Sequence, residues 1–384
     1  MNIKRQVELP ELVSELQKEN LQKRDFVLPA KCISMINGKI IVTNNDNNKD
    51  LQNILSECKI EHSPDLLDKN QMELDCLSVI HTHLQDKLGI PTKYYNRLLS
   101  KEDKWLLDAN VTHWLQQSNS NHLLRCFVDK ENKKGFARAL LSDRFKTIDN
   151  YDIMLAVLSA IKESGLNIKI DDTKDEKGKA GCDLTETNMY LRFVCPDIQI
   201  NSPELLKHYR PDGLPNEVGD GIVSGFVVTN SEVGMGQFSI SPRAKVLACK
   251  NGMVRTKDDF SKTHLGGKLG QYTTIDWSEE TKQKNFELII AQIRDAIKKY
   301  VSEEYLGNTV KHFIEKNKQL EFPMDAIKAA TISLNINEDK ANDIINTFMK
   351  SADMSAFGVT QAITYFAHTN SRLAKLSFLQ TTCQ

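Results

Sequence analysis

The sequence predicts an α+β protein: a central, largely antiparallel β-sheet domain flanked by an N-terminal helical and hairpin region and by a C-terminal helical region. Three observations predict this fold class. Short β-rich segments crowd the middle third of the chain, helical periodicity runs from Asp276 onwards, and helices alternate with a hairpin before residue 120. We therefore expect three regions, at residues 1–120, 121–275 and 276–384.

The N-terminal region combines amphipathic helices with one tight hairpin. Apolar residues at helical spacing predict helices over about 9–22, 72–88 and 92–119. Between the first two, Asn37 and Gly38 separate two apolar runs. This dipeptide favours a type I′ turn because both of its positions need a positive φ.

The middle region alternates short β-rich segments with one helix. Asp149 and Asn150 offer N-caps for this helix, and Gly165 ends it. The surrounding segments show the alternation and the turn residues that are typical of antiparallel strands. Side chains at the ends of such strands are frequent carriers of function.

Composition and charge limit the classes of protein to which this chain can belong. The chain has 384 residues, of which 40% are hydrophobic and 26% charged, as in an ordinary folded protein, and its net charge of -1 neither demands nor excludes nucleic acid. The 8 cysteines form no C-x-x-C pair, which argues against zinc and redox motifs and favours free thiols in a reducing compartment. Without a long apolar run or an N-terminal signal core, we expect a cytoplasmic protein with no membrane partner.

The first candidate site follows a predicted strand that carries Arg138. Ser142, Asp143 and Arg144 stand at the end of this strand, directly before the helix. They could carry function, or Asp143 and Arg144 could form an ion pair that only stabilises the turn. The sequence leaves both interpretations open.

The second candidate site is the stretch 229–236. If the strand keeps its period of two, Asn230 and Glu232 project from the same side. Gly234 and Gly236 then allow a sharp turn, or the close approach of a ligand to the backbone. The alternative is a solvated strand end before a hairpin.

The third candidate site is the basic stretch 242–270, which follows directly. Its basic residues, with Asn251 at a hairpin tip, would suit phosphate oxygens, although a solvated lysine-rich surface is the alternative. They are Arg243, Lys245, Lys250, Arg255, Lys257, Lys262 and Lys268, opposed by Asp258 and Asp259. His264, beside two glycines, adds one imidazole to the same stretch.

These stretches, in this order, resemble the phage/plasmid-like protein family (domain of unknown function 932). The matching segments are KRDFVLPA (23–30), LGIPTKYYNRLL (88–99), RALLSDRFKTIDN (138–150), TNSEVGMGQFSISP (229–242), CKNGM (249–253), THLGG (263–267) and QAITYFAHTNS (361–371). The resemblance implies a phage or mobile-element setting and, by association, a role near DNA replication, recombination or the contest with host defence. It implies no catalytic residue.

The leading hypothesis is a phage- or plasmid-derived protein that binds nucleic acid, with single-stranded DNA favoured. It would act as an annealing or recombination factor, and it could form a homo-oligomer. Its phosphate contacts would come from Arg138, Arg144, Asn230 and the basic stretch. Aromatic residues are sparse there, and we interpret the distant Trp105, Trp114 and Trp277 as core or interface residues rather than as a stacking platform for bases.

Two alternatives stay open. In a Mg²⁺- or Mn²⁺-dependent nuclease or phosphohydrolase, Asp143 and Glu232 would hold the metal, and these two residues or His264 would serve in catalysis. In an anti-defence protein, the C-terminal helices would bind a host protein. The sequence leaves enzyme activity undecided.

Overall fold

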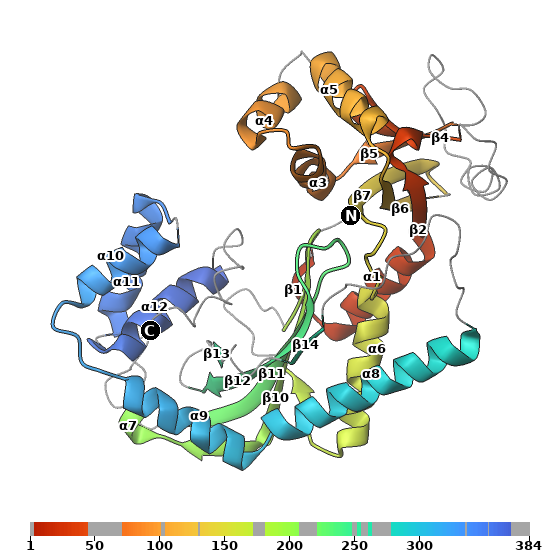
Figure 1. Cartoon of the computed structure of the whole chain (residues 1–384). Coiled ribbons are helices and arrows are strands. Elements are labelled where there is room, and N and C mark those ends of the chain that lie inside the picture. Colours follow the sequence, from red (N-terminus) through yellow and green to blue (C-terminus); the bar gives the residue numbers. More distant parts are fainter. Residues whose placement is uncertain are drawn as a thin grey trace.

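The structure is a computed structural model, in which the strands form two separate sheets and helices pack on both (Figure 1). The predicted α+β class is therefore confirmed. The structure describes residues 4–44, 71–100, 104–129, 131–171, 181–206, 221–247, 252–254, 260–262, 278–334, 336–351 and 353–369.

The N-terminal sheet has six strands in the order β2-β6-β7-β5-β4-β3. All of its pairs are antiparallel except β5 with β7. At the tip of the predicted hairpin between β3 and β4, Asn37 and Gly38 have φ of 52° and 76°, as a type I′ turn requires. The strands are β2 (Lys23–Pro29), β3 (Ile33–Ile36), β4 (Lys39–Thr43), β5 (Gln71–Cys76), β6 (Asn121–Asp129) and β7 (Lys134–Ser142), with a short 3-10 helix η1 (Ala30–Cys32) before β3.

Two expectations for this half of the chain are corrected. The segment predicted as one helix over about 72–88 contains strand β5 before helix α3 (Ser78–Leu88), and in β5 only the alternate residues Met72 and Leu74 are buried, which is the period of a strand. The boundary expected at residue 120 divides a sheet, because β6 and β7 pair with β2 and β5. Hydrogen bonds between distant segments define this unit, and sequence order does not show them.

Three helices cover the N-terminal sheet and complete its core. They are α3, α4 (Thr92–Ser100) and α5 (Lys104–Gln117). α5 buries Leu107, Val111 and Leu115, which repeat at the helical spacing of four residues. We call the N-terminal sheet with these three helices the N-terminal lobe, and it forms one end of the molecule (Figure 1).

The large sheet has eight strands in the order β1-β9-β10-β11-β12-β13, with β14 paired to β12 and β8 to β10. Every pair between these described strands is antiparallel, so the predicted largely antiparallel sheet is confirmed. The strands are β1 (Lys4–Val7), β8 (Lys169–Ile170), β9 (Cys182–Leu184), β10 (Met189–Asn201), β11 (Gly221–Asn230), β12 (Phe238–Val246), β13 (Gly252–Val254) and β14 (Phe260–Lys262).

One face of the large sheet packs under two long helices, α6 (Asn150–Ser164) and α8 (Glu279–Tyr300). Apolar residues at alternate positions, such as Phe193, Phe226 and Phe238, form this core. Helix α1 (Leu9–Gln22) contributes to the same core and connects β1 of the large sheet to β2 of the N-terminal sheet. α1 therefore links the two sheets covalently.

The remaining helices confirm the predicted C-terminal helical region. α7 (Pro203–Leu206) and α9 (Glu303–Lys316) pack against the ends of β11 and β12 in a small core of their own. α10 (Pro323–Ser333), α11 (Glu338–Ser351) and α12 (Ala356–Thr369) form a separate bundle with its own core. Figure 1 shows this bundle at the opposite end of the molecule from the N-terminal lobe.

Candidate functional site

The stretch around Asn230 forms the turn between β11 and β12, and it is buried. Asn230 donates hydrogen bonds to the carbonyl oxygen of Ile148 and to the side-chain oxygen of Asn150, both at 2.9 Å. Ser231 projects to the other side, where its hydroxyl donates to the carbonyl oxygen of Thr187 at 2.7 Å. The turn is therefore attached to the protein on both sides, and it is not a solvated strand end.

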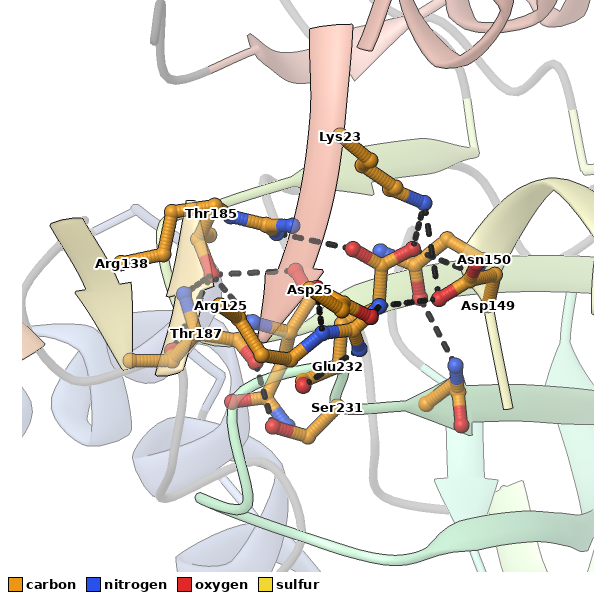
Figure 2. Close-up of polar contacts among 12 residues, drawn as sticks. Lys23, Asp25, Arg125, Arg138, Asp149, Asn150, Thr185, Thr187, Ser231 and Glu232 are labelled. Atoms are coloured by element: carbon orange, nitrogen blue, oxygen red, sulfur yellow. Dashed lines mark hydrogen bonds and ion pairs between the residues drawn. The ribbon is translucent and has the colours of Figure 1, made fainter. Parts of the chain in front are cut away.

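Glu232 lies at the centre of a buried set of charges (Figure 2). Its Oε1 accepts from Lys23 Nζ at 2.5 Å and from the backbone N–H of Asn150 at 2.7 Å, and its Oε2 accepts from Arg138 Nη2 at 2.8 Å. Burial raises the pKa of Glu232, but the charges of Arg138, Lys23 and Arg125 outweigh burial and lower this pKa to about 2. Since Asn230 and Glu232 both bond to Asn150, the predicted shared side is confirmed.

Arg125, on β6, adds three more contacts to this set. Its Nε donates to Asp25 at 3.0 Å, its Nη2 to Asp149 at 2.7 Å, and its Nη1 to the backbone carbonyl of Glu232 at 2.9 Å. Asp149 occupies the predicted N-cap position of α6, but its side chain makes no capping bond. We call this set the junction network, which consists of Lys23, Asp25, Arg125, Arg138, Asp149, Asn150 and Glu232 (Figure 2).

The junction network joins two parts of the protein. Lys23, Arg125 and Arg138 come from three strands of the N-terminal sheet, whereas Glu232 follows β11 of the large sheet. Removing one partner of such a buried pair leaves the other charge uncompensated, at a cost of about 3–5 kcal/mol. The network therefore holds the N-terminal lobe against the large sheet.

Of the residues predicted for catalysis, the structure describes Asp143 and Glu232, and these two have no partner in common. Both carboxylate oxygens of Glu232 are neutralised by cations, so Glu232 suits neither a metal ligand nor a general base. Asp143 has its own local hydrogen bond from Ser142 at 3.3 Å, and Arg144 is exposed. His264 lies outside the described residues, among which no group of three or more His, Cys, Asp and Glu is placed to hold a metal ion.

The basic stretch 242–270 does not begin as a surface. Arg243 and Lys245 lie in β12, where each is only 5% exposed, and both pair with Asp171 at 2.5 Å. Arg138 and Asn230 are buried as well, so none of these four offers a phosphate contact at the surface. Among the other predicted phosphate contacts, Lys262 belongs to β14, and only its backbone is described. Four more lie outside the described residues: Lys250, Asn251, Arg255 and Lys268.

The N-terminal lobe exposes large aromatic side chains. Trp105 is 67% exposed, Trp114 49% and Tyr94 41%. The ring of His113 packs edge-on against Trp114, with 5.2 Å between the ring centroids. Of the two predicted roles, core or interface, Trp105 and Trp114 do not have the first, and Trp277 lies outside the described residues.

Cations accompany these aromatic residues. Together, η1, α4 and α5 contain four exposed basic residues and one acidic residue, Asp108. The carboxylate of Asp108 accepts hydrogen bonds from the backbone N–H groups of Asn37 and Gly38. Lys101, Glu102 and Asp103, between α4 and α5, lie outside the described residues. We call the resulting set the aromatic–basic surface: Tyr94, Trp105, His113 and Trp114 with Lys31, Lys93, Arg97 and Lys104.

The sequence contains a signal for one part of this surface, Trp105. The core stripe of α5 is Leu107, Val111 and Leu115, and neither Trp105 nor Trp114 continues its spacing of four. Because 3.6 residues make one turn, residue 105 lies about 120° from the centre of the stripe, whereas residue 114 lies about 60° from it on the other side. Trp105 therefore lies away from the apolar stripe, which is a sequence signal for exposure, whereas Trp114, seven positions after Leu107, borders the stripe and carries no such signal.

The comparisons with known proteins add no relative. No family model matches the chain, and neither a curated protein nor a solved structure does. The resemblance to the phage/plasmid-like family thus stays a prediction. In the part of the chain that the structure describes, no helix is both long and apolar enough to cross a membrane.

Proposed function

We propose that the protein binds single-stranded nucleic acid, with single-stranded DNA favoured, through the aromatic–basic surface. The observation that carries this proposal is the exposure of Trp105 and Trp114 on α5, in a lobe whose elements η1, α4 and α5 also expose four cations. No carboxylate of the described residues lies within ion-pair distance of Lys93, Arg97 or Lys104. Large exposed aromatic residues in a protein commonly mark an interaction site.

The chemistry of the surface fits an unpaired strand. Bases stack on exposed aromatic rings at a gain of about 1–3 kcal/mol per base, while lysine and arginine attract the phosphates between them. A duplex offers its phosphates but hides the faces of its bases, so it would use only the cations. The two tryptophans are nine positions apart in one helix, or ~13 Å along its axis and about half a turn around it, so each would stack a base on its own side of α5.

The biological setting is supported by the resemblance described above. A phage or plasmid protein that binds unpaired DNA without a catalytic group would serve annealing or recombination. The competing nuclease hypothesis loses its central carboxylate, because Glu232 is neutralised in the junction network. We therefore propose binding rather than cleavage.

The test is a titration of the protein with a fluorescein-labelled oligothymidine at several salt concentrations. We expect Trp105→Ala and Trp114→Ala each to weaken binding by about 5- to 140-fold, the equivalent of 1–3 kcal/mol. Since Trp105 and Trp114 are two of the 3 tryptophans in the chain, stacking should also quench the intrinsic fluorescence of the parent protein. Lys93→Glu with Arg97→Glu should reduce the salt slope by roughly 1.4.

Matched controls lie on the C-terminal helices. Phe322→Ala removes an aromatic side chain that is 66% exposed, and Lys311→Glu reverses an exposed charge on α9, so neither should change affinity. If the parent protein binds no oligonucleotide at low salt, the proposed function is wrong. Binding that survives both tryptophan substitutions would keep the function and place it on another surface.

A further inference from the structure

Glu19 is a buried carboxyl group without a direct partner. It lies on α1, the helix that connects the two sheets, and it is 4% exposed. Neither of its carboxyl oxygens has a hydrogen-bond partner. Such a group is rare in a folded protein, because an unpaired buried polar atom costs about 1–3 kcal/mol and an unpaired charge costs more.

The cation that influences Glu19 most is engaged elsewhere. Arg138 donates from Nη2 to Glu232, and its guanidinium carbon lies 3.9 Å from the centroid of the Phe127 ring. Its Nε and Nη1 have no hydrogen-bond partner, yet they form no ion pair with Glu19. Glu19 and Arg138 therefore influence each other through space without touching.

The charges of the junction network are already matched without Glu19. Lys23 and Arg138 contact Glu232, and Arg125 contacts Asp25 and Asp149, so three cations meet three carboxylates. Glu19 would be a fourth negative charge in the same buried volume. Four charged groups act on Glu19 through space: Arg138, Lys23, Glu232 and Glu15. Further charged groups on the elements around α1 include Arg125 on β6, Asp149 and Asp152 at the start of α6, and Asp183 on β9, which pairs with Arg192.

We propose that Glu19 is a proton-binding site that makes the junction between the two sheets sensitive to pH. Below neutral pH the carboxyl group is uncharged and the junction network keeps its matched charges. Above neutral pH the ionised Glu19 competes with Glu232 for Arg138, so the junction weakens. This inference rests on the junction network alone and does not depend on nucleic acid binding.

The direction of the pH effect follows from the pKa of Glu19. Burial, partly offset by the charge of Arg138, raises this pKa from its ordinary value of 4.5 to about 7. Because the folded state then holds its proton more tightly than the unfolded state, the contribution of Glu19 to stability is fully present below pH 4.5. It is lost as the pH rises towards 7.

The test compares urea unfolding of the parent protein, Glu19→Gln and Glu15→Gln between pH 4.5 and pH 8. The glutamine side chain keeps the shape of the uncharged carboxyl group, so we expect Glu19→Gln to match the parent at pH 4.5. At pH 8 its folding constant should exceed the parent's by on the order of 100-fold. The quantity to compare is the difference in stability between the parent and Glu19→Gln at each pH. Burial lowers the pKa of His81, His83 and His122, so these groups titrate in the same range and stabilise the fold as the pH rises, and the difference cancels their effect.

A second measurement does not require the variant to fold. Infrared spectra of the folded parent should show a protonated carboxyl group at pH 6 that disappears with a midpoint near pH 7. Glu15→Gln removes a carboxyl group one turn away on α1 whose charge has the smallest influence on the pKa of Glu19, so it should change both results far less than Glu19→Gln does. A parent-minus-variant difference that is flat from pH 4.5 to pH 8 would overturn the proposal, and so would an ionised Glu19 at pH 6.

Discussion

The junction network and the aromatic–basic surface depart from the usual distribution of residue types in opposite directions. The network buries charged side chains such as Arg125 and Glu232, whereas the surface exposes large aromatic ones such as Trp105. Each buried charge of the network contacts a charge of opposite sign within the chain. In the described structure, the indoles of Trp105 and Trp114 are not covered by other parts of the chain, so packing within the protein does not explain why tryptophan stands at these positions. This difference is why we infer a structural role for the network and propose a binding role for the surface.

The largest expected effect concerns the stability of the network. Glu232→Ala leaves Lys23 and Arg138 buried without their carboxylate, so we expect the free energy of unfolding to fall by about 3–5 kcal/mol. Urea unfolding at pH 7 measures it. As a control, Glu280→Ala on α8 removes an exposed carboxylate and should stay within about 0.5 kcal/mol of the parent. Equal effects of the two substitutions would contradict the structural role of Glu232.

A smaller effect should appear in acid. The pKa of Glu232 is lowered to about 2 in the folded protein from its ordinary 4.5, so its contribution to stability is complete above pH 4.5 and declines as the pH falls towards 2. We expect the stability difference between the parent and Glu232→Gln to shrink by about 3 kcal/mol across this range. Urea unfolding of both proteins at several pH values measures that difference. If it does not depend on pH, Glu232 is not held ionised by its neighbours.

The smallest expected effect on stability belongs to the aromatic–basic surface. Because Trp105 is 67% exposed, Trp105→Ala should change the free energy of unfolding by no more than about 0.5 kcal/mol. Thermal unfolding of the two proteins compares them directly. A loss of several kcal/mol would mean that Trp105 supports the fold, and its proposed role in stacking bases would lose its basis.

Local features of the fold could be predicted from the sequence. Asn37 and Gly38 adopt the positive φ angles that their turn requires, and Gly165 at the C-cap of α6 does the same. Asn230 and Glu232 were predicted on one side and both bond to Asn150, although β11 ends at Asn230 and Glu232 lies in the turn that follows. These features depend on neighbours within a few positions, so residue type and spacing were sufficient.

The function of the charged residues could not be predicted in the same way. Lys23 and Glu232 form a buried pair although 209 positions separate them, and no local pattern relates the two. Arg243 and Lys245 belong to a basic stretch of sequence, yet they are buried with Asp171. A charge run indicates a surface only when its counter-charges are local, and here the counter-charges come from distant strands.

The sequence by itself therefore determined the α+β class, the antiparallel strands and the turn at Asn37 and Gly38, because these follow from short-range sterics and from periodicity. Only the tertiary structure decided which polar residues are inside and which aromatic residues are outside. Burial depends on which distant segments pack together, and α1 brings the two sheets into the contact that buries Glu232. The stretch around Asn230 is consequently part of an internal junction, and the exposed helix α5 carries the proposed function.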